Sequence, residues 1–483
     1  MMVEKRLAVE RVMMDVLLIQ PDKLPGLRTT RSSIPISLLY LGAALRNRGY
    51  QPYIWDLSTQ NLPAEGAERR EKIESFFRKN FMGISTKVVG INCFTTMHFP
   101  LVREIAAIIK SIDENIKIII GGAHPTFFGE DILKNCPEID YISIGEGEET
   151  IIGVIDAITN NMGFSEIPAL LYRDGKSVRT NNRIEYISDI ESFEMPAWDL
   201  IDISLYRGNY ETYYNPKKQN FSLTVPIITS RSCPFSCSFC SAHLIMGKKY
   251  RKKSAIQVVD EIQFIHERYG ENYFAFLDDI INIDKSHVID ICKEIVKRNL
   301  NIQFSINQGL YISLVDEEMV DALYEAGLVT VSLPIEHGDE NIRRNVLRKK
   351  LTNDKIYEVA GYIKKHNIFT IGLFIMGFPE ETEDTLERTR KFIIDLSLDI
   401  NGVSNLIPFP RTSIHDQAVR DGLFVVDTGE VWEGKAYFDP GNRNDFFIKP
   451  RNSDLNVLRR YRKIFDDMYF FTDRAKNLNQ GKC

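Results

Sequence analysis

The sequence predicts an α/β protein of two parallel-sheet domains followed by a small helical extension. From about residue 15 to 150, short apolar runs alternate with longer segments of helical period, which is typical of βαβ units. The same alternation resumes near residue 225 and continues to about residue 409. We therefore expect a first domain at 1–155, a linker with a β-hairpin at 156–222, a second domain at 223–425 and a C-terminal extension at 426–483.

The first domain contains four runs that are too apolar to be half-exposed strands, and they indicate a buried parallel sheet. They are DVLLIQ (15–20), VVGINC (88–93), IKIII (116–120) and DYISIG (140–145). Segments of helical period lie between them, such as Ile36 to Arg48, which stops at Gly49. This pattern predicts a Rossmann-like (flavodoxin-like) fold, in which ligands bind at the carboxyl ends of the strands.

Small and polar residues follow three of these strands. Paired glycines let a ligand approach the backbone, and hydroxyl or carboxylate groups can hold amides or a ribose. A nicotinamide-binding fingerprint is absent, because Gly145-Glu146-Gly147 has no third glycine. The candidate ligand contacts are Thr95, Thr96, Gly121, Gly122, His124, Gly145, Glu146, Gly147 and Glu148.

The second domain contains six apolar runs separated by helical segments. One helix is expected to begin after Ser254 and to end at Gly270. Six βα units predict an open, partial (βα)6 barrel whose chemistry lies at the C-terminal mouth. We expect the helical tail (454–471) to cap this mouth, with a plain surface helix as the alternative. The predicted strands are 225–230, 273–279, 302–307, 329–336, 369–377 and 402–409.

Three cysteines follow the first barrel strand at four- and three-residue intervals: Cys233, Cys237 and Cys240. A [4Fe–4S] cluster held by three thiolates has one iron left open for another ligand, and this spacing suits such a site. A zinc loop with His243 as fourth ligand is one alternative. A disulfide pair is the other, and it would need an oxidising compartment.

The motif Cys-x3-Cys-x2-Cys, with Phe239 before the last cysteine, resembles the signature of radical S-adenosylmethionine (SAM) enzymes. The resemblance implies that the open iron binds the amino and carboxylate groups of SAM. It also implies that an electron from the cluster cleaves SAM to methionine and a 5′-deoxyadenosyl radical.

The first domain resembles the cobalamin-binding domain of cobalamin-dependent radical SAM enzymes. The resemblance lies in the segment Pro35-Ile36-Ser37-Leu38-Leu39-Tyr40-Leu41, the Gly-Gly-x-His-Pro turn at 121–125 and Gly-Glu-Gly-Glu-Glu-Thr at 145–150. It implies cobalamin as a cofactor. The Asp-x-His-x-x-Gly motif that supplies a histidine ligand to cobalt in other cobalamin proteins is absent, so we expect cobalamin without such a ligand. His98 and His124 are the histidines near the presumed cobalt face or nucleotide loop.

Polar residues at the barrel strand ends are the candidates for holding SAM. Asp278 or Asp279 would accept from the ammonium group, and the two carboxylates cannot both point into the barrel. Cations such as Arg344 or Lys349 would pair with the carboxylate. The further candidates are Ser305, Asn307 and Glu336 for the polar groups, with Phe239, Met376 and Gly377 beside the cluster and adenine.

Together the two resemblances imply a C-methyltransferase. The radical would take hydrogen from an unactivated carbon of a small-molecule, lipid or peptide substrate, and methylcobalamin would supply the methyl group. A cobalamin-dependent oxidative cyclase or ring-rearranging enzyme is the alternative, and a corrinoid-binding protein without activity is a distant one. Methylthiotransferase chemistry would need three more cysteines in the N-terminal half, where only Cys93 and Cys136 occur.

The amino-acid composition limits the classes of partner that we expect. The net charge is −6, with 60 basic and 66 acidic residues well mixed, so nucleic acid is not an expected partner. No apolar run approaches the roughly 18 residues of a transmembrane helix, and the charged N-terminus does not read as a signal peptide. We expect a cytoplasmic enzyme that takes electrons from a donor such as flavodoxin or ferredoxin.

Overall fold

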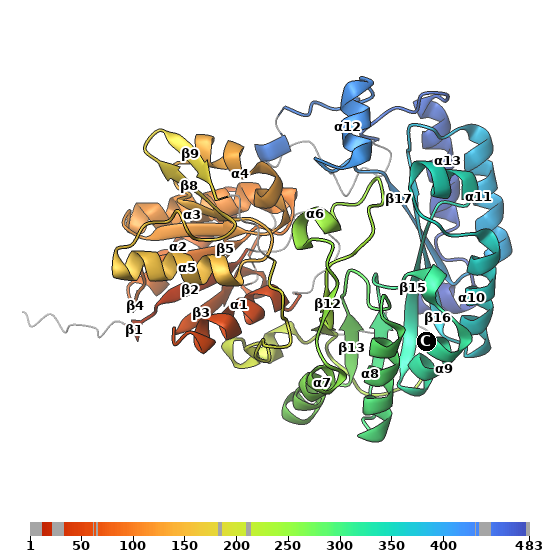
Figure 1. Ribbon diagram of the computed structural model, residues 1–483, viewed down its shortest axis with the longest axis horizontal. Helices are drawn as coiled ribbons and strands as arrows, with labels where there is room; N and C mark the ends of the chain where they lie inside the picture. Colours follow the sequence, from red (N-terminus) through yellow and green to blue (C-terminus); the bar gives the residue numbers. More distant parts are fainter. Residues whose placement is uncertain are drawn as a thin grey trace, which may run out of the picture. The chain divides into compact units, whose positions relative to one another are not determined.

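The computed structural model describes residues 12–21, 33–60, 62–63, 66–181, 186–208, 214–429, 431–433 and 446–479. The chain forms two compact units (Figure 1). Unit 1 consists of residues 1–187, 193–206 and 429–438, and unit 2 consists of residues 188–192, 207–428 and 439–483.

Unit 1 is built on a seven-stranded sheet. The strand order is β3 (Pro52–Asp56), β2 (Val16–Gln20), β5 (Val88–Asn92), β6 (Lys117–Gly121), β7 (Tyr141–Ser143), β8 (Leu170–Asp174) and β9 (Ser177–Thr180). The first five strands are parallel. Their order along the sheet, 2-1-3-4-5 in chain numbering, is that of the flavodoxin-like doubly wound fold, which confirms the predicted fold class. Two short strands, β1 (Val12–Met13) and β4 (Ile84–Ser85), pair separately.

Helices cover both faces of this sheet. Helices α1 (Ile36–Asn47) and α5 (Glu148–Asn160) pack on the face formed by residues such as Val16 and Leu18. Helices α2 (Ala67–Phe81), α3 (Phe99–Ile112) and α4 (Ala123–Asn135) pack on the opposite face, which includes Leu17 and Ile19. Adjacent strand residues thus enter different cores, which explains why these strands are apolar throughout.

Two features of this sheet differ from the expectation. The hairpin β8–β9, which we had placed in the linker, pairs antiparallel with β7 and extends the sheet. Strand β3 was not predicted, because PYIWD begins with proline and shows no clear apolar run. Proline is compatible with this position, since it is the first residue of an edge strand.

Unit 2 contains six parallel strands that follow one another in chain order, as predicted for a partial (βα)6 barrel. They are β10 (Val225–Ile227), β13 (Tyr273–Phe276), β14 (Gln303–Ile306), β15 (Leu328–Glu336), β16 (Phe369–Met376) and β17 (Ile400–Asn405). The connecting helices are α7 (Ala255–Tyr269), α8 (Lys285–Lys297), α9 (Glu317–Glu325), α10 (Asn353–Lys365) and α11 (Glu383–Leu396). Helix α7 begins after Ser254, which forms a capping box, and ends at Gly270, as expected.

The inner face of the barrel is open. On β16, a central strand, Ile371, Leu373 and Ile375 keep accessible surface, whereas the residues between them are buried. Successive side chains on a strand point to opposite faces, so the accessible series lines the concave side and the buried series packs under the helices. The open face on β16 is therefore apolar.

The two described helices of the C-terminal extension do not cap the mouth as we expected, whereas residues 446–451 do lie beside the turn that follows β16. Helix α13 (Leu455–Asp467) packs against α11 and β17, and Arg462 on α13 donates to the carbonyl of Val403. Helix α14 (Asp473–Asn479) lies at the amino-terminal ends of the strands, where Arg474 pairs with Asp399. Because Asp399 precedes β17, its ion pair with Arg474 holds α14 at the end of the barrel opposite the mouth.

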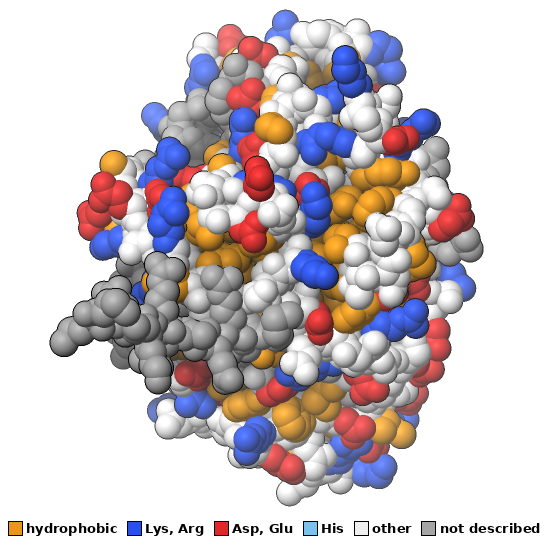
Figure 2. All heavy atoms as spheres, turned by 90° about the vertical axis from the view of Figure 1, so that its left-hand side faces the viewer, with side chains coloured by type: hydrophobic (Ala, Val, Ile, Leu, Met, Phe, Trp, Pro, Cys, Tyr) orange, Lys and Arg blue, Asp and Glu red, His pale blue; other side chains and the backbone are white. Residues whose placement is uncertain are grey.

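The charges on the face drawn in Figure 2 are mixed, because lysine and arginine side chains alternate there with aspartate and glutamate. Among the described residues, no helix is both long and apolar enough to cross a membrane.

Candidate functional site

The cysteine loop is delivered by β10 and closed at its neck by a short two-stranded ribbon. Strand β11 (Ser230–Arg231) leads into the loop, helix α6 (Ala242–Met246) follows the cysteines, and strand β12 (Arg251–Lys252) pairs back onto β11. The loop therefore leaves and re-enters the fold at one point. This point lies at the carboxyl end of β10, where the predicted barrel mouth is.

Arg251 joins the two sides of this neck. Its guanidinium donates to Ser232 Oγ at 2.5 Å and to the Met246 carbonyl at 2.8 Å, and Ser232 Oγ donates to the same carbonyl at 2.7 Å. Arg251 is 4% exposed and Ser232 is fully buried. Ser232 also has φ 81°, a left-handed conformation that is rare outside glycine. The residue before the first cysteine is thus held in a specific backbone geometry.

The three thiols lie near one another and are free. Burial raises the pKa of Cys237 to about 11 and that of Cys240 to about 12, and Cys233 adds to both shifts through its own charge. No three His, Cys, Asp or Glu side chains in the described part of the chain are close enough to hold one metal ion. A [4Fe–4S] cluster with one open iron needs three thiolates, whereas a structural zinc site needs a fourth protein ligand.

The loop is docked onto the segment that follows the π-helical turn η6 (Ile342–Val346). Ser238 donates from its backbone to the Leu347 carbonyl at 3.1 Å and from its hydroxyl to the Val346 carbonyl at 2.7 Å. Phe235 stacks on Tyr311 with ring centroids 4.1 Å apart. Phe239 packs with Phe378, which follows β16. The predicted aromatic residue before Cys240 therefore lies beside the end of β16.

The structure separates the two aspartates after β13. Asp278 is 2% exposed, and its Oδ1 accepts from the backbone and hydroxyl of both Thr229 and Ser230. Asp279 is exposed and makes no hydrogen bond among the described residues. Burial by surrounding protein still raises the pKa of Asp279, Arg251 opposes this shift, and its charge is felt at Cys233 and Cys240. Asp279 is thus the carboxylate that lies near the thiols and remains available.

Ser305 lies in the middle of the barrel sheet. The register aligns Ala275, Ser305 and Thr330 across β13, β14 and β15, so their side chains share one face. Ser305 is 3% exposed, and Asn307, just beyond β14, is partly exposed.

Glu336 ends β15 and carries a buried ion pair. Its Oε1 accepts from Lys349 Nζ at 2.9 Å, and Lys349 is 4% exposed. The same ammonium lies 5.8 Å from the Tyr311 ring, and its charge opposes the rise that burial causes in the pKa values of Cys233 and Cys237. Arg344 is exposed and forms no ion pair among the described residues. Of the two cations that we considered, the structure brings Lys349 to the cysteines and leaves Arg344 at the surface.

The turn after β16 is fixed by a buried carboxylate. Glu381 Oε2 accepts from the backbone of Gly377 and Phe378, and its Oε1 faces His337 Nε2 at 3.1 Å. His337 Nδ1 accepts from the Asp339 backbone, so the ring proton lies on Nε2 and is donated to Glu381. Gly377 has φ 99°, and Met376 is 1% exposed. The side chain of Met376 is buried, which leaves backbone atoms as the contacts that this turn can offer.

In unit 1, the two threonines after β5 contact two histidines, His98 in the same segment and His124 in α4. Thr95 Oγ1 lies 2.9 Å from His98 Nδ1, and Thr96 Oγ1 lies 3.2 Å from His124 Nδ1. His124 is 2% exposed, lies against the rings of Phe99 and Phe128, and has its pKa lowered to about 3 by burial. This burial argues against direct contact between His124 and a ligand.

Two glycines near the carboxyl ends of β6 and β7, Gly121 and Gly147, lie beside a buried hydroxyl, that of Ser143. A Cβ added to Gly122 would meet the Cys93 carbonyl oxygen at 2.5 Å, and its φ of 122° also requires glycine. Cβ atoms added to Gly121 and Gly147 would lie 3.6 Å from Ser143 atoms. Ser143 Oγ is buried and has no partner among the described residues. Backbone that is free of side chains around an unpartnered hydroxyl fits a polar ligand group better than packing alone.

The predicted acidic residues of this region are mostly turned inward. Glu146 is 9% exposed and accepts from the Ile187 backbone at 2.9 Å, and Glu148 is 5% exposed at the start of α5. Gly145 has φ 70° and donates to Thr126 Oγ1 at 3.0 Å. These contacts show that the two carboxylates help to shape the segment, whatever ligand it holds.

Sequence reasoning missed Arg251, Ser143 and the pair His337–Glu381. Arg251 lies in the run Lys248-Lys249-Tyr250-Arg251-Lys252-Lys253, where nothing marks one cation as buried. The histidine and glutamate are 44 residues apart, and only the fold pairs them. Ser143, by contrast, could have been found, because it lies in a predicted strand that ends beside the chosen glycines.

Comparison with known families agrees with this division. Residues 227–393 match the Radical SAM superfamily, and residues 28–155 match the B12 binding domain. The chain thus contains a domain of the Radical SAM superfamily and a B12 binding domain, and a [4Fe–4S] cluster, SAM and cobalamin are the cofactors of these two domains.

This chain is similar to relatives that are named for two different activities, methyl transfer and cyclisation. An uncharacterized methyltransferase of Pyrococcus horikoshii is 29% identical over 371 residues, covering 76% of this chain and 76% of the relative. An anaerobic magnesium-protoporphyrin IX monomethyl ester cyclase of Rubrivivax gelatinosus is 28% identical over 443 residues, covering 90% and 74%. The fold resembles that of the methyltransferase TsrM from Kitasatospora setae, solved with cobalamin and a [4Fe–4S] cluster. The TM-score is 0.68 at 18% identity, over 86% of this chain and 76% of that one.

Proposed function

We propose that this protein is a radical SAM C-methyltransferase that places a methyl group from cobalamin on an unactivated carbon. The observation that carries the proposal is the presence of both cofactor domains in one chain, with the cysteine loop at the carboxyl ends of the barrel strands. When bound, the cluster supplies the electron for reductive cleavage of SAM, and cobalamin supplies the methyl group.

Cys233, Cys237 and Cys240 would hold the cluster, and they leave one iron for SAM. Asp279 is the carboxylate suited to the SAM ammonium group, because it is accessible and close to the thiols. Lys349 would neutralise the SAM carboxylate, and Glu336 would accept from a ribose hydroxyl.

The other residues that we expect to contact SAM would have supporting roles. Ser305 and Asn307 would meet polar groups of SAM from β14. The turn at Gly377, held by Glu381, offers backbone atoms to adenine, and the rings of Phe239, which is partly buried, and Phe378, which is buried, form its apolar surroundings.

In unit 1, the ends of β6 and β7 would hold cobalamin. The hydroxyl of Ser143 and the backbone at Gly121, Gly122 and Gly147 would contact the ligand, and Thr95 and Thr96 would line the neighbouring turn. His124 contributes through packing, since it is buried against two rings. Cobalamin is therefore expected to bind without a histidine of this chain on cobalt.

The protein's own part in the chemistry is to position groups and exclude water. The accessible residues Ile371, Leu373 and Ile375 give the inner face of the barrel an apolar surface, which protects a reactive carbon from water. No side-chain nucleophile or general base is required for this role.

A second candidate, oxidative cyclisation without methyl transfer, is favoured by one observation. The similar cyclase of Rubrivivax gelatinosus aligns with 90% of this chain, more than the methyltransferase of Pyrococcus horikoshii does. A corrinoid carrier without activity would leave the buried, pre-formed cysteine loop unused.

One experiment separates these candidates. The anaerobically reconstituted protein is incubated with cobalamin, a reductant and SAM labelled in its methyl group, and products are followed by mass spectrometry. Label on a carbon of the product together with 5′-deoxyadenosine is the expected result. Deoxyadenosine with an unlabelled, oxidised product would establish cyclase chemistry, and no cleavage of SAM would reject both.

We further propose a small-molecule, lipid or peptide substrate and a cytoplasmic location. Three thiolates that must bind a cluster need a reducing environment, and their raised pKa values mean that the cluster itself must drive their deprotonation.

A further inference from the structure

We propose that Arg348 and Lys350, together with Arg344, form the docking surface for an acidic electron-carrier protein that reduces the cluster. This set is called the basic patch below. The inference rests on the proposed function, because only a cluster that is reduced in each reaction needs an electron donor.

The basic patch is the outer side of the segment that holds the cysteine loop. The sequence from Arg343 to Lys350 contains five cations and no carboxylate, in a chain whose net charge is −6. Along Leu347-Arg348-Lys349-Lys350, side chains alternate between buried and exposed positions. Lys349 points inward to Glu336 and the cysteines, whereas Arg348 and Lys350 point outward.

The backbone that carries the basic patch contacts the cysteine loop directly. The carbonyls of Val346 and Leu347 accept directly from Ser238, which is the residue after Cys237. Two hydrogen bonds therefore connect the backbone just before Arg348 to the cysteine loop. Electron transfer slows steeply with distance, so a donor bound at this surface would be favourably placed.

The patch is also available for a partner. Arg344 and Lys350 make no ion pair among the described residues, and Arg348 binds only the hydroxyl of Ser413, at 3.1 Å. Glu340, the nearest carboxylate before the run, is already used by the Asn353 backbone. Unpaired cations at the surface attract an acidic partner and speed its encounter.

The redox step is a single electron transfer. The reduced flavin or iron–sulfur centre of the donor loses one electron and the oxidised cluster gains it, and no bond or proton need move. A cluster reduced in this way is the species required for the proposed cleavage of SAM.

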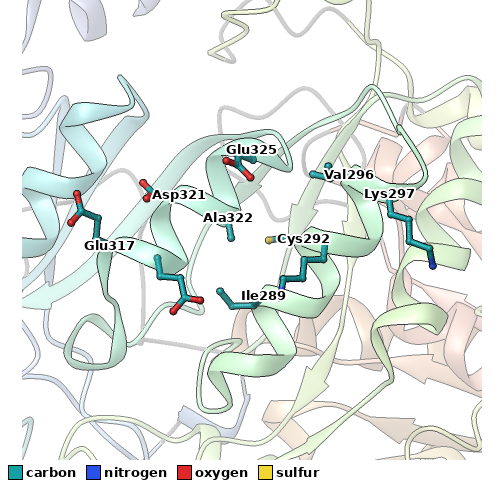
Figure 3. A pocket seen from close by; sticks show the side chains of 10 residues that line it. Ile289, Cys292, Val296, Lys297, Glu317, Asp321, Ala322 and Glu325 are labelled. Carbon is teal, nitrogen blue, oxygen red and sulfur yellow. The ribbon is translucent and has the colours of Figure 1, made fainter.

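The test uses the reconstituted full-length protein and reduced flavodoxin as the probe. The variant R348E/K350E reverses two charges of the basic patch without touching the proposed cofactor contacts. Its matched control is K293E/K297E, which reverses two exposed cations of α8. Both lysines line an outer groove between α8 and α9. In Figure 3, the Lys297 side chain points away from Cys292, which also lines this groove.

Cluster reduction is followed by the loss of its visible absorbance and by electron paramagnetic resonance. We expect flavodoxin to reduce R348E/K350E about tenfold more slowly than the parent protein at low ionic strength, with a smaller difference in high salt. Dithionite, which needs no docking, should reduce both proteins equally fast. The control variant should behave as the parent with both reductants.

Other results would overturn the inference. Equal flavodoxin rates for the two double variants would mean that the basic patch is not the docking surface. An equal loss with flavodoxin and dithionite would mean that the substitutions damage the cluster site. Because reduction is measured directly, the outcome stands even if labelled SAM shows that no methyl group is transferred, which would reject the proposed function alone.

Discussion

Two adjacent aspartates show how one residue of a pair can be structural while the other stays available. Asp278 receives four hydrogen bonds from Thr229 and Ser230, which lie between β10 and the cysteine loop. Asp279 is accessible and lies near the thiols. The residue that fixes the strand and the residue that can meet SAM are therefore different.

We predict that substitution of Asp278 lowers the stability of the protein, whereas substitution of Asp279 weakens SAM binding. Asp278→Ala leaves buried donors without acceptors and should destabilise the protein by about 3 kcal/mol in urea unfolding. Asp279→Asn should change stability by less than about 0.5 kcal/mol but weaken SAM binding about tenfold, measured by equilibrium dialysis.

The control is Asp278→Asn, which keeps the accepting oxygen and should recover most of the lost stability. If Asp279→Asn binds SAM as tightly as the parent, Asp279 is not the ammonium partner. If Asp278→Ala is fully stable, the hydrogen bonds to Thr229 and Ser230 do not matter.

The buried pair of Glu336 and Lys349 yields a second prediction. Among the described residues, Lys349 is the cation that pairs with the Glu336 carboxylate, whose side chain is 11% exposed. Lys349→Met should therefore destabilise the protein without SAM by about 3 kcal/mol. The double variant K349M/E336Q removes both charges and should regain at least half of this loss. Urea unfolding of the parent protein, Lys349→Met, Glu336→Gln and the double variant gives the coupling energy. Strictly additive effects would contradict a direct ion pair.

At the scale of elements, the cysteine loop is shaped by its neck. Ribbon β11–β12 brings the two ends together, Arg251 binds both of them, and Ser238 fastens the middle of the loop to Leu347. Arg251 and Ser238 are thus positioning residues, since they touch the loop and not the reacting atoms. The hydrogen bonds of the neck also offset the left-handed backbone at Ser232.

We predict that Arg251→Met weakens retention of the cluster. The reconstituted variant should lose iron to a chelator at least about tenfold faster than the parent, because one buried charged group loses two hydrogen bonds at the neck. The electron paramagnetic resonance spectrum of the reduced cluster should also change, since the cysteine geometry shifts.

Lys252→Met is the matched control, because the neighbouring cation is partly exposed and pairs only with Asp284. It should keep the iron as the parent does. Arg251→Lys should rescue only part of the loss, since an ammonium group lacks the planar fork of guanidinium. Parent-like chelation of Arg251→Met would show that the neck is stable without this contact.

At the scale of the whole molecule, the sequence predicted the repeating strands and helices. It did not predict contacts between side chains that are far apart in the sequence. All six barrel strands and four sheet strands appear where apolar runs occur, because buried parallel strands must be apolar on both faces. The cysteine triad was visible because its ligands are local in sequence. The contacts Lys349–Glu336, Arg251–Met246 and Glu381–Gly377 depend on side-chain direction, which spacing alone does not fix.

The two elements whose positions were predicted wrongly, the hairpin and the C-terminal helices, have the same explanation. Hairpin β8–β9 was visible as a hairpin, but its pairing with β7 is a long-range contact. The tail was helical as expected, but the bond of Arg474 to Asp399 decides which end of the barrel it covers. Local pattern thus predicts the element, and a distant partner decides its place.

His124 in unit 1 and His287 in unit 2 are buried histidines whose protonation should make the protein sensitive to acid. Burial lowers the pKa of His124 in unit 1 to about 3 and that of His287 in unit 2 to about 4. An unfolded histidine titrates near pH 6.5, so at pH 5 the unfolded chain binds protons that the folded chain does not. Stability is therefore fully present above about pH 6.5 and falls as the pH drops toward 4.

The last prediction follows from this sign. Between pH 7 and 5, each of these histidines should lower the free energy of unfolding by about 2 kcal/mol. The three tryptophans, Trp55, Trp198 and Trp432, all belong to unit 1, so their fluorescence reports the unfolding of that unit. In His124→Phe, which keeps an aromatic ring between Phe99 and Phe128, the loss seen by fluorescence should shrink by about 2 kcal/mol. His287→Gln should leave the fluorescence-detected loss unchanged, and an undiminished loss in His124→Phe would show that His124 is not the group that titrates.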